Sequence, residues 1–180
     1  MVKRVLIAAV VLCVTPCFAV DLRNTQWYGQ GGITVTLDGQ SEWEPFEGVI
    51  VFTGNSPKKG AAELGGLGCK WTSKSVSSPS FILIPLQSAA NQIADGVRAQ
   101  IPEAKVKVKP TPMSGTASLQ TGTITYAVRF KVSVKYMGYR FSGFVTIDQS
   151  GYQLTGLTAT GQGGPLLSKI HEAIADLLDR

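Results

Sequence analysis

The chain has few of the residues from which active sites and metal sites are built. Of its 180 residues, three are cysteine and one is histidine. Two cysteines fall within the first nineteen residues, so only Cys69 and His171 are left for the remainder. One thiol and one imidazole far apart in sequence do not suit a zinc site, and no acidic run has the spacing of a calcium loop. We therefore expect no metal and no cofactor.

Long apolar runs are also missing, except at the N-terminus. There a basic MVKR is followed by VLIAAVVLCV and by TPCFA, which ends in Ala19. This order is typical of a cleavable secretory signal peptide over 1–19, and the run is too short to cross a bilayer as a helix. We expect residues 20–180 to form one domain without a membrane-spanning segment, in the bacterial periplasm or secreted. A lipoprotein is the alternative, but neither cysteine of this segment follows a small residue.

Acidic residues are the minority, although the imbalance is modest. The chain has 17 Lys and Arg against 12 Asp and Glu, a formal charge of +5. Without the two basic residues of the signal peptide, 15 basic groups face 12 acidic ones, a balance of +3. This surplus is small for a nucleic-acid-binding protein, and no recognition module is present, so we expect no nucleic acid as partner.

Alternation of apolar and polar residues predicts strands in the first half of the chain. In ITVTLD, Ile33, Val35 and Leu37 share one face, and the following Asp38-Gly39 is a turn signal. A Gly- and Ser-rich region further on favours only a weak strand. The strands expected here cover residues 33–38, 47–53, 68–73 and 80–86, with a loop over 54–60.

The period then changes to that of a helix. Apolar residues at spacings of three and four predict an amphipathic helix over 87–101, which ends before Pro102. Four strands linked by a few residues each form an antiparallel meander, over 115–120, 123–136, 139–148 and 152–160, and a second amphipathic helix follows over 165–178. The expected fold class is mainly β (α+β): a curved antiparallel β-meander sheet or partial barrel with one inserted helix and a C-terminal amphipathic helix.

Trp27 stands just before the first strand, and the chain ends in a helix after the meander. This outline resembles that of the lipocalins and related calycin barrels, whose first strand begins with Gly-x-Trp. Thr25 stands where that glycine would be, and the helix over 87–101 interrupts the meander. The resemblance implies a barrel-like architecture and carries no family assignment.

The longest alternating run, TITYAVRFKVSVKY, has an apolar face that the helices are expected to cover. A curved sheet can enclose a hydrophobic ligand, and tyrosine offers an apolar ring with one polar group. The residues predicted to line a ligand site are Tyr126, Phe130, Tyr136 and Phe141. The alternative is that these side chains simply fill the core.

The opposite face of the same region is basic. Between Arg98 and Arg140 the only acidic residue is Glu103. We define the basic face by the residues Lys105, Lys107, Lys109, Arg129, Lys131, Lys135 and Arg140. If they share one surface, it would attract anionic envelope material such as lipid headgroups, lipopolysaccharide or an acidic protein. An ordinary solvated surface is the alternative.

No catalytic constellation is visible. Cys69 and His171 lack an orienting third group, so we expect a buried thiol and an exposed histidine, with an intermolecular disulfide through Cys69 as the other interpretation. Gly161-x-Gly163 lacks the third glycine of a dinucleotide loop and is expected to separate strand from helix. The three carboxylates of SEWEPFEG are expected on a surface loop: Glu42, Glu44 and Glu47.

Two hypotheses of function follow. The first is an exported, non-enzymatic envelope protein that binds a lipid or other hydrophobic ligand inside its curved sheet. The second is a protein-interaction or assembly subunit, an adaptor or an inhibitor, that docks through the basic face or the terminal helix.

Overall fold

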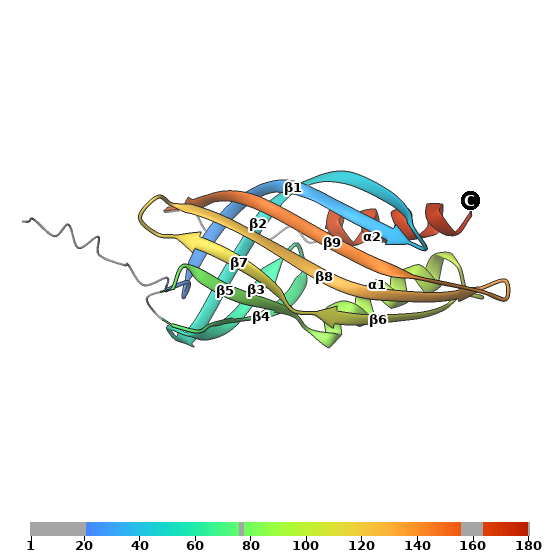
Figure 1. The fold of residues 1–180 in the computed structure, drawn as a ribbon, viewed down its shortest axis with the longest axis horizontal. Coiled ribbons are helices and arrows are strands. Elements are labelled where there is room, and N and C mark those ends of the chain that lie inside the picture. Colours follow the sequence, from blue (N-terminus) through green and yellow to red (C-terminus); the bar gives the residue numbers. More distant parts are fainter. Residues whose placement is uncertain (1–20, 76–77, 156–163, 180) are drawn as a thin grey trace, which may run out of the picture.

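This computed structural model describes residues 21–75, 78–155 and 164–179, and its fold is drawn in Figure 1. The predicted signal peptide, the Gly161-x-Gly163 link and residues 156–160 lie outside these ranges. The described elements are, in order, β1 (Thr25–Leu37), β2 (Gln40–Ser56), β3 (Lys59–Leu64), β4 (Leu67–Ser73), β5 (Ser80–Pro85), α1 (Gln87–Gln100), β6 (Lys105–Thr111), β7 (Met113–Ser118), β8 (Thr123–Tyr136), β9 (Tyr139–Leu154) and α2 (Gly164–Leu178).

Eight of the described strands form a closed antiparallel barrel. Successive strands pair with one another, except that α1 and β6 intervene between β5 and β7. The ring closes because β1 and β9 pair from Gln26 opposite Leu154 to Leu37 opposite Gly143. The ninth strand, β6, lies outside the ring and pairs with β8. The predicted curved sheet or partial barrel is confirmed, and the barrel is closed.

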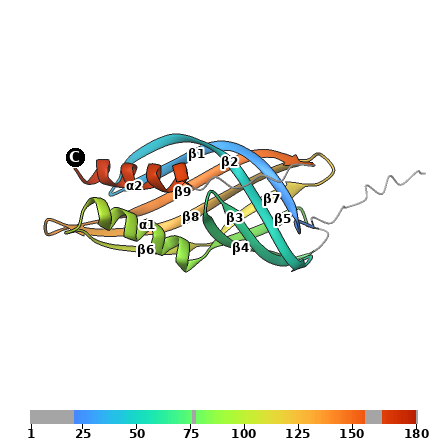
Figure 2. The ribbon, with the colours of Figure 1, turned by 180° about the vertical axis from the view of Figure 1, so that it is seen from behind.

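The closed part of the barrel ends partway along β8, where the strand that pairs with β8 changes from β7 to β6. Residues 123–125 of β8 pair with β7, whereas residues 129–135 pair with β6 along the same edge. β3 likewise accompanies only the second half of β2, from Ile50 onward. Toward the β8–β9 turn the barrel therefore opens into a curved sheet of β6, β8, β9, β1 and β2. The two helices lie over the concave side of that open half, with α1 on β6 and α2 on β1 and β2 (Figure 2).

Aromatic side chains occupy the interior of the closed half. The ring of Phe52 on β2 packs edge-on against Trp71 of β4 and Phe81 of β5, with centroids 6.2 and 5.6 Å apart. All three are fully or almost fully buried. Edge-to-face ring pairs add to the free energy of burial, so this cluster links strands on three parts of the barrel wall.

The start of β1 is held by a buried chain of hydrogen bonds. The indole N–H of Trp27 donates to the hydroxyl of Thr25 over 2.9 Å, and that hydroxyl donates to the carbonyl of Leu22 over 2.7 Å. Leu22 and Trp27 are fully buried. The barrel architecture that the calycin resemblance implied is thus present, with Trp27 in its core.

Both predicted helices are confirmed, each within one residue of the expected bounds at either end. Ile93 and Val97 of α1 and Ile170 and Ile174 of α2 are fully buried. They belong to the same hydrophobic cluster as the apolar positions of β8. The expectation that helices cover the apolar face of 123–136 is met in the open half of the sheet, while the barrel wall encloses the other half.

Two predicted breaks in the sheet are wrong. Gln149-Ser150-Gly151 was expected to be a turn, but it continues β9, because this segment pairs with β8 on one side and β1 on the other. The loop expected over 54–60 reduces to Pro57-Lys58, since β2 continues to Ser56 and β3 begins at Lys59. Turn-forming residue types yield to strand pairing when neighbouring strands offer partners. The sequence also missed most of the length of β1 and the whole of β3.

Two surface assignments also need correction. The segment with Glu42, Glu44 and Glu47 lies within β2 and not on a loop. His171 was expected on a solvent-facing side of its helix, but it packs against α1. A Cβ atom at Gly96 would lie 1.9 Å from its Cε1 atom, so the missing side chain is what admits the ring. Its Nε2 is buried and has no hydrogen-bond partner among the described residues.

We expect Gly96→Ala to destabilise the protein, because the added methyl group overlaps the His171 ring and forces the helices apart. Overpacking of this kind costs about 1–3 kcal/mol, which urea unfolding would measure. With His171→Ala as background, the same replacement should be neutral or stabilising, since alanine favours a helix over glycine by about 1 kcal/mol. Equal losses in both backgrounds would contradict this account of the helix contact.

Candidate functional site

The four residues predicted to line a ligand site do not form one cluster. Tyr126 and Phe130 point inward from β8 and are almost fully buried. Tyr136 and Phe141 lie near the β8–β9 turn, where they are half-buried against the edge of the core. Tyr126 and Tyr136 are ten residues apart on one strand, a separation of about 33 Å. A single small ligand could not contact all four.

Tyr126 has a buried polar partner that the sequence did not reveal. Its hydroxyl donates to the amide oxygen of Gln149, and the Gln149 amide nitrogen donates to the carbonyls of Gly29 and Phe46, each over 3.3 Å. Burial raises the pKa of Tyr126, so its hydroxyl stays protonated. Because Gln149 lay in a predicted turn, nothing in the sequence pointed to this pair, whose polar groups satisfy one another inside the barrel.

Cys69 and His171 have separate surroundings. Burial raises the pKa of the Cys69 thiol to about 12, and its Sγ atom donates to the carbonyl of Leu67 over 3.9 Å. Burial lowers the pKa of His171, an effect offset in part by a hydrogen bond to the Gln92 backbone and by the charge of Glu172. A thiol held protonated is a poor nucleophile. The expected buried thiol is confirmed.

Cys69 also borders a surface pocket of about 400 Å³ between β2, β3 and β4, where Glu63 is the other titratable side chain. Within residues 21–75, 78–155 and 164–179, no three His, Cys, Asp or Glu side chains gather as metal ligands would. None of the helices in those ranges is long and apolar enough to cross a membrane.

The basic face comes together through the strand register. Lys105 of β6 lies opposite Lys135 of β8, and Lys135 lies opposite Arg140 of β9, so three cations cross three strands in one row. Four residues further along β6, Lys109 lies opposite Lys131 of β8 and forms a second pair of cations. Adjacent strands are about 4.8 Å apart, and alternate residues of one strand about 7 Å apart. The outcome is a closely spaced grid of cations on the outside of the barrel.

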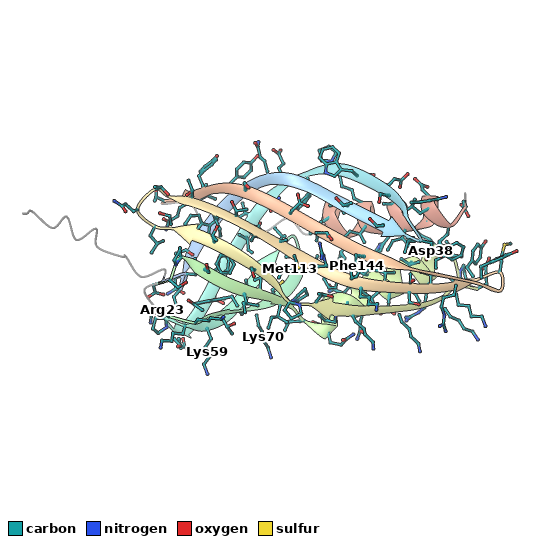
Figure 3. The ribbon with its side chains drawn as sticks, in the orientation of Figure 1. Arg23, Asp38, Lys59, Lys70, Met113 and Phe144 are labelled. Carbon is teal, nitrogen blue, oxygen red and sulfur yellow. The ribbon has the colours of Figure 1, made fainter. Side chains whose placement is uncertain are left out.

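The remaining two members complete this grid. Lys107 projects between the two rows, opposite Ser133. Arg129 is the one member held in place: its Nε donates to the Thr146 hydroxyl over 3.1 Å, and its guanidinium lies 5.4 Å from the centre of the Phe144 ring. The cation is thereby anchored beside Phe144, which is labelled in Figure 3.

Among the described residues, carboxylates lie at the border of the basic face and not within it. Asp38, labelled in Figure 3, accepts a hydrogen bond from the backbone N–H of Ser142 over 2.9 Å. Asp148 lies opposite Ala127, one row beyond Arg129. The ion pairs formed within the described ranges all lie elsewhere: Arg23–Asp21, Arg98–Asp95 and Lys169–Glu44. No carboxylate of those ranges separates the basic side chains from one another.

The outer surface also carries exposed aromatic rings that the sequence analysis missed. Phe144 is 40% exposed beside Arg129, and Trp43 is 60% exposed on β2. Since successive residues of a strand alternate between faces, the parity of Phe144 with Arg140 was the available signal. Phe141, which the sequence predicted to line the ligand site, points to the inner side of the sheet.

The fold and this surface define a class: a closed antiparallel β-barrel with an apolar interior and a basic patch over β6, β8 and β9. No protein-family model, curated protein or solved structure matches the chain. The geometry of these side chains is therefore the best indication of function.

Cys69 should be unreactive in the folded protein, because its thiol is buried and stays protonated. A thiol reagent at mildly alkaline pH should modify it only after denaturant unfolds the barrel. Non-reducing gel electrophoresis of the native protein provides the control and should show no disulfide-linked dimer. Rapid labelling without denaturant would contradict the burial of the thiol. A dimer that disappears on reduction would support an intermolecular disulfide through Cys69.

Lys135→Glu should raise stability, because it replaces two repulsive cross-strand contacts, with Lys105 and Arg140, by attractive ones. We expect a gain of about 0.5–1 kcal/mol, smaller at high salt, where charges are screened. Urea unfolding at two salt concentrations measures it. Lys70→Glu is the control, since exposed Lys70 lies opposite Ala61 and Ile84. Equal gains in the free energy of unfolding from both variants would show that stability depends on net charge and not on the cross-strand neighbours of Lys135.

Proposed function

We propose that the chain is an exported, non-enzymatic β-barrel protein of the bacterial envelope that binds an anionic surface through its basic face. The observation that carries the proposal is the row Lys105–Lys135–Arg140, in which like charges stand directly opposite one another. Like charges in this position destabilise a sheet. An anion lying over the row would neutralise the repulsion and gain a charge-assisted contact with each strand.

An ordinary solvated surface accounts less well for this pattern. Solubility is served by charges of both signs dispersed over a surface. Here the cations are contiguous, of one sign and spread over three paired strands, with carboxylates confined to the border. The backbone that carries these cations is already ordered by strand pairing, so only side chains lose freedom when an anion binds.

The hypothesis of an internal hydrophobic ligand stays a prediction, with less support. An eight-stranded barrel is just wide enough to be filled by side chains or to hold one small ligand. Phe52, Trp71 and Phe81 pack on one another inside the closed half, and Tyr126 is bonded to Gln149. A ligand there would have to displace these contacts. Native mass spectrometry of the protein purified from its host tests this hypothesis, because a bound lipid adds mass.

Binding to heparin, a soluble polyanion, tests the basic face directly. The double variant Lys105→Gln/Lys135→Gln should lose about tenfold or more in affinity at about 0.15 M salt, because each lysine near an anionic surface contributes about 1 kcal/mol. The control is Lys59→Gln/Lys70→Gln, which removes the same charge from β3 and β4 (Figure 3). Equal losses in both double variants, or no binding by the wild type, would overturn the proposal.

A further inference from the structure

The β8–β9 hairpin extends past the rest of the sheet. Its strands stay paired up to Tyr136 opposite Tyr139, whereas β1 ends at Leu37 opposite Gly143 and β6 begins at Lys105 opposite Lys135. The last pair before the turn, Tyr136–Tyr139, thus has no described strand on either side, and β9 has none on its edge away from β8 before Gly143. Both views show the hairpin projecting beyond the two helices (Figures 1 and 2).

The apex of this hairpin is apolar and exposed. Met137 is 76% exposed and Tyr139 is 71% exposed, the highest values among the large hydrophobic side chains described. Met137 and Gly138 both have positive φ, 48° and 85°, as a two-residue hairpin turn with right-handed strand twist requires. Asparagine is the usual residue before glycine in such a turn and tolerates positive φ better than methionine. Neither turn geometry nor packing accounts for methionine here.

The hairpin has two chemically different faces behind its apex. Because residues alternate along each strand, Tyr136, Tyr139 and Phe141 share the inner side, and Lys135 and Arg140 share the outer side. The cations come within one or two residues of the apex, a distance of about 3–7 Å. Lys105 extends the cationic side from the neighbouring strand.

We infer that the hairpin is a membrane anchor: its apex enters the interface of an anionic lipid bilayer, and the basic row behind it contacts the lipid phosphates. Tyrosine favours the level of the headgroups, and basic side chains beside it reach the anionic surface. Interfacial segments lie about 5–10 Å into the boundary between headgroups and acyl chains, so an apex at that depth leaves cations about 3–7 Å behind it at the level of the headgroups. This inference rests on the proposed function and names its partner.

A bilayer suits this surface better than a protein partner does. A stable protein interface buries about 800 Å² on each partner around a well-packed apolar centre. The hairpin offers two exposed apolar side chains at a narrow tip, with the cationic grid behind them. A fluid interface needs no complementary pocket for a tip of this kind, and its phosphates neutralise the cations.

The test uses the full mature chain and vesicles of phosphatidylethanolamine with about 30% phosphatidylglycerol. Met137→Ser/Tyr139→Ser should reduce vesicle binding by about tenfold or more, because it removes the apolar groups that enter the interface. Its binding to heparin should equal that of the wild type. Tyr152→Ser is the matched control: Tyr152 is also an exposed tyrosine of β9, 56% exposed, but lies at the other end of that strand.

A fluorescent reporter measures insertion separately from binding. In a Trp43→Phe background the remaining tryptophans, Trp27 and Trp71, are fully buried, so Met137→Trp reports on the apex. Its emission should shift to shorter wavelength on vesicles and be quenched by lipids with brominated acyl chains. Heparin should produce neither change.

The outcomes separate the two proposals. If the apex variant binds vesicles as the wild type does, or the reporter is not quenched, the anchor is overturned while heparin binding still supports the basic face. If the wild type binds heparin but not vesicles, the lipid partner is overturned in favour of a soluble or protein polyanion. If it binds neither, both proposals fail.

Discussion

The structure depends on the continuous pairing of β9, which has β8 along one edge and β1 along the other. This pairing closes the barrel, and in the closed half it leaves none of the described strand edges exposed to invite aggregation. It also determines the facing of every residue on three strands, since a shift of one position would turn the whole strand over. The buried Tyr126–Gln149 pair and the pairing of Lys135 with Arg140 both follow from the β8–β9 register, and the β6–β8 register adds Lys105 to the row.

The apolar side of the sheet is covered differently in the closed half and in the open half. In the closed half, aromatic rings from β2, β4 and β5 pack on one another and form part of the core. In the open half the sheet cannot close on itself, so α1 and α2 supply the second layer that its apolar face requires. This arrangement fills the inner side of the molecule and leaves the outer side, with its charges and exposed rings, as the surface available for recognition.

Stability and recognition make opposite demands on that outer side. A sheet is most stable when neighbouring side chains attract one another, and the basic face instead places like charges opposite each other. Lysine softens the repulsion because its long stem lets each ammonium group move into water. The projecting hairpin likewise has a residue that does not favour stability, since the exposed Met137 with positive φ suits neither the turn nor the core. Both features become understandable when their surroundings are an anionic interface.

The sequence by itself determined what depends on local periodicity. The facing of Lys105, Lys107 and Lys109, the two amphipathic helices and the Met137-Gly138 turn all follow from neighbours a few residues apart. Only the tertiary structure decided what depends on distant partners. Gln149 stays extended because its strand pairs with β8 and β1, where its side-chain amide donates to Gly29, 120 residues away. His171 packs between the helices because Gly96 of another helix admits its ring. Barrel closure and the gathering of the cations belong to this second group, because strand register between distant segments leaves no local signature.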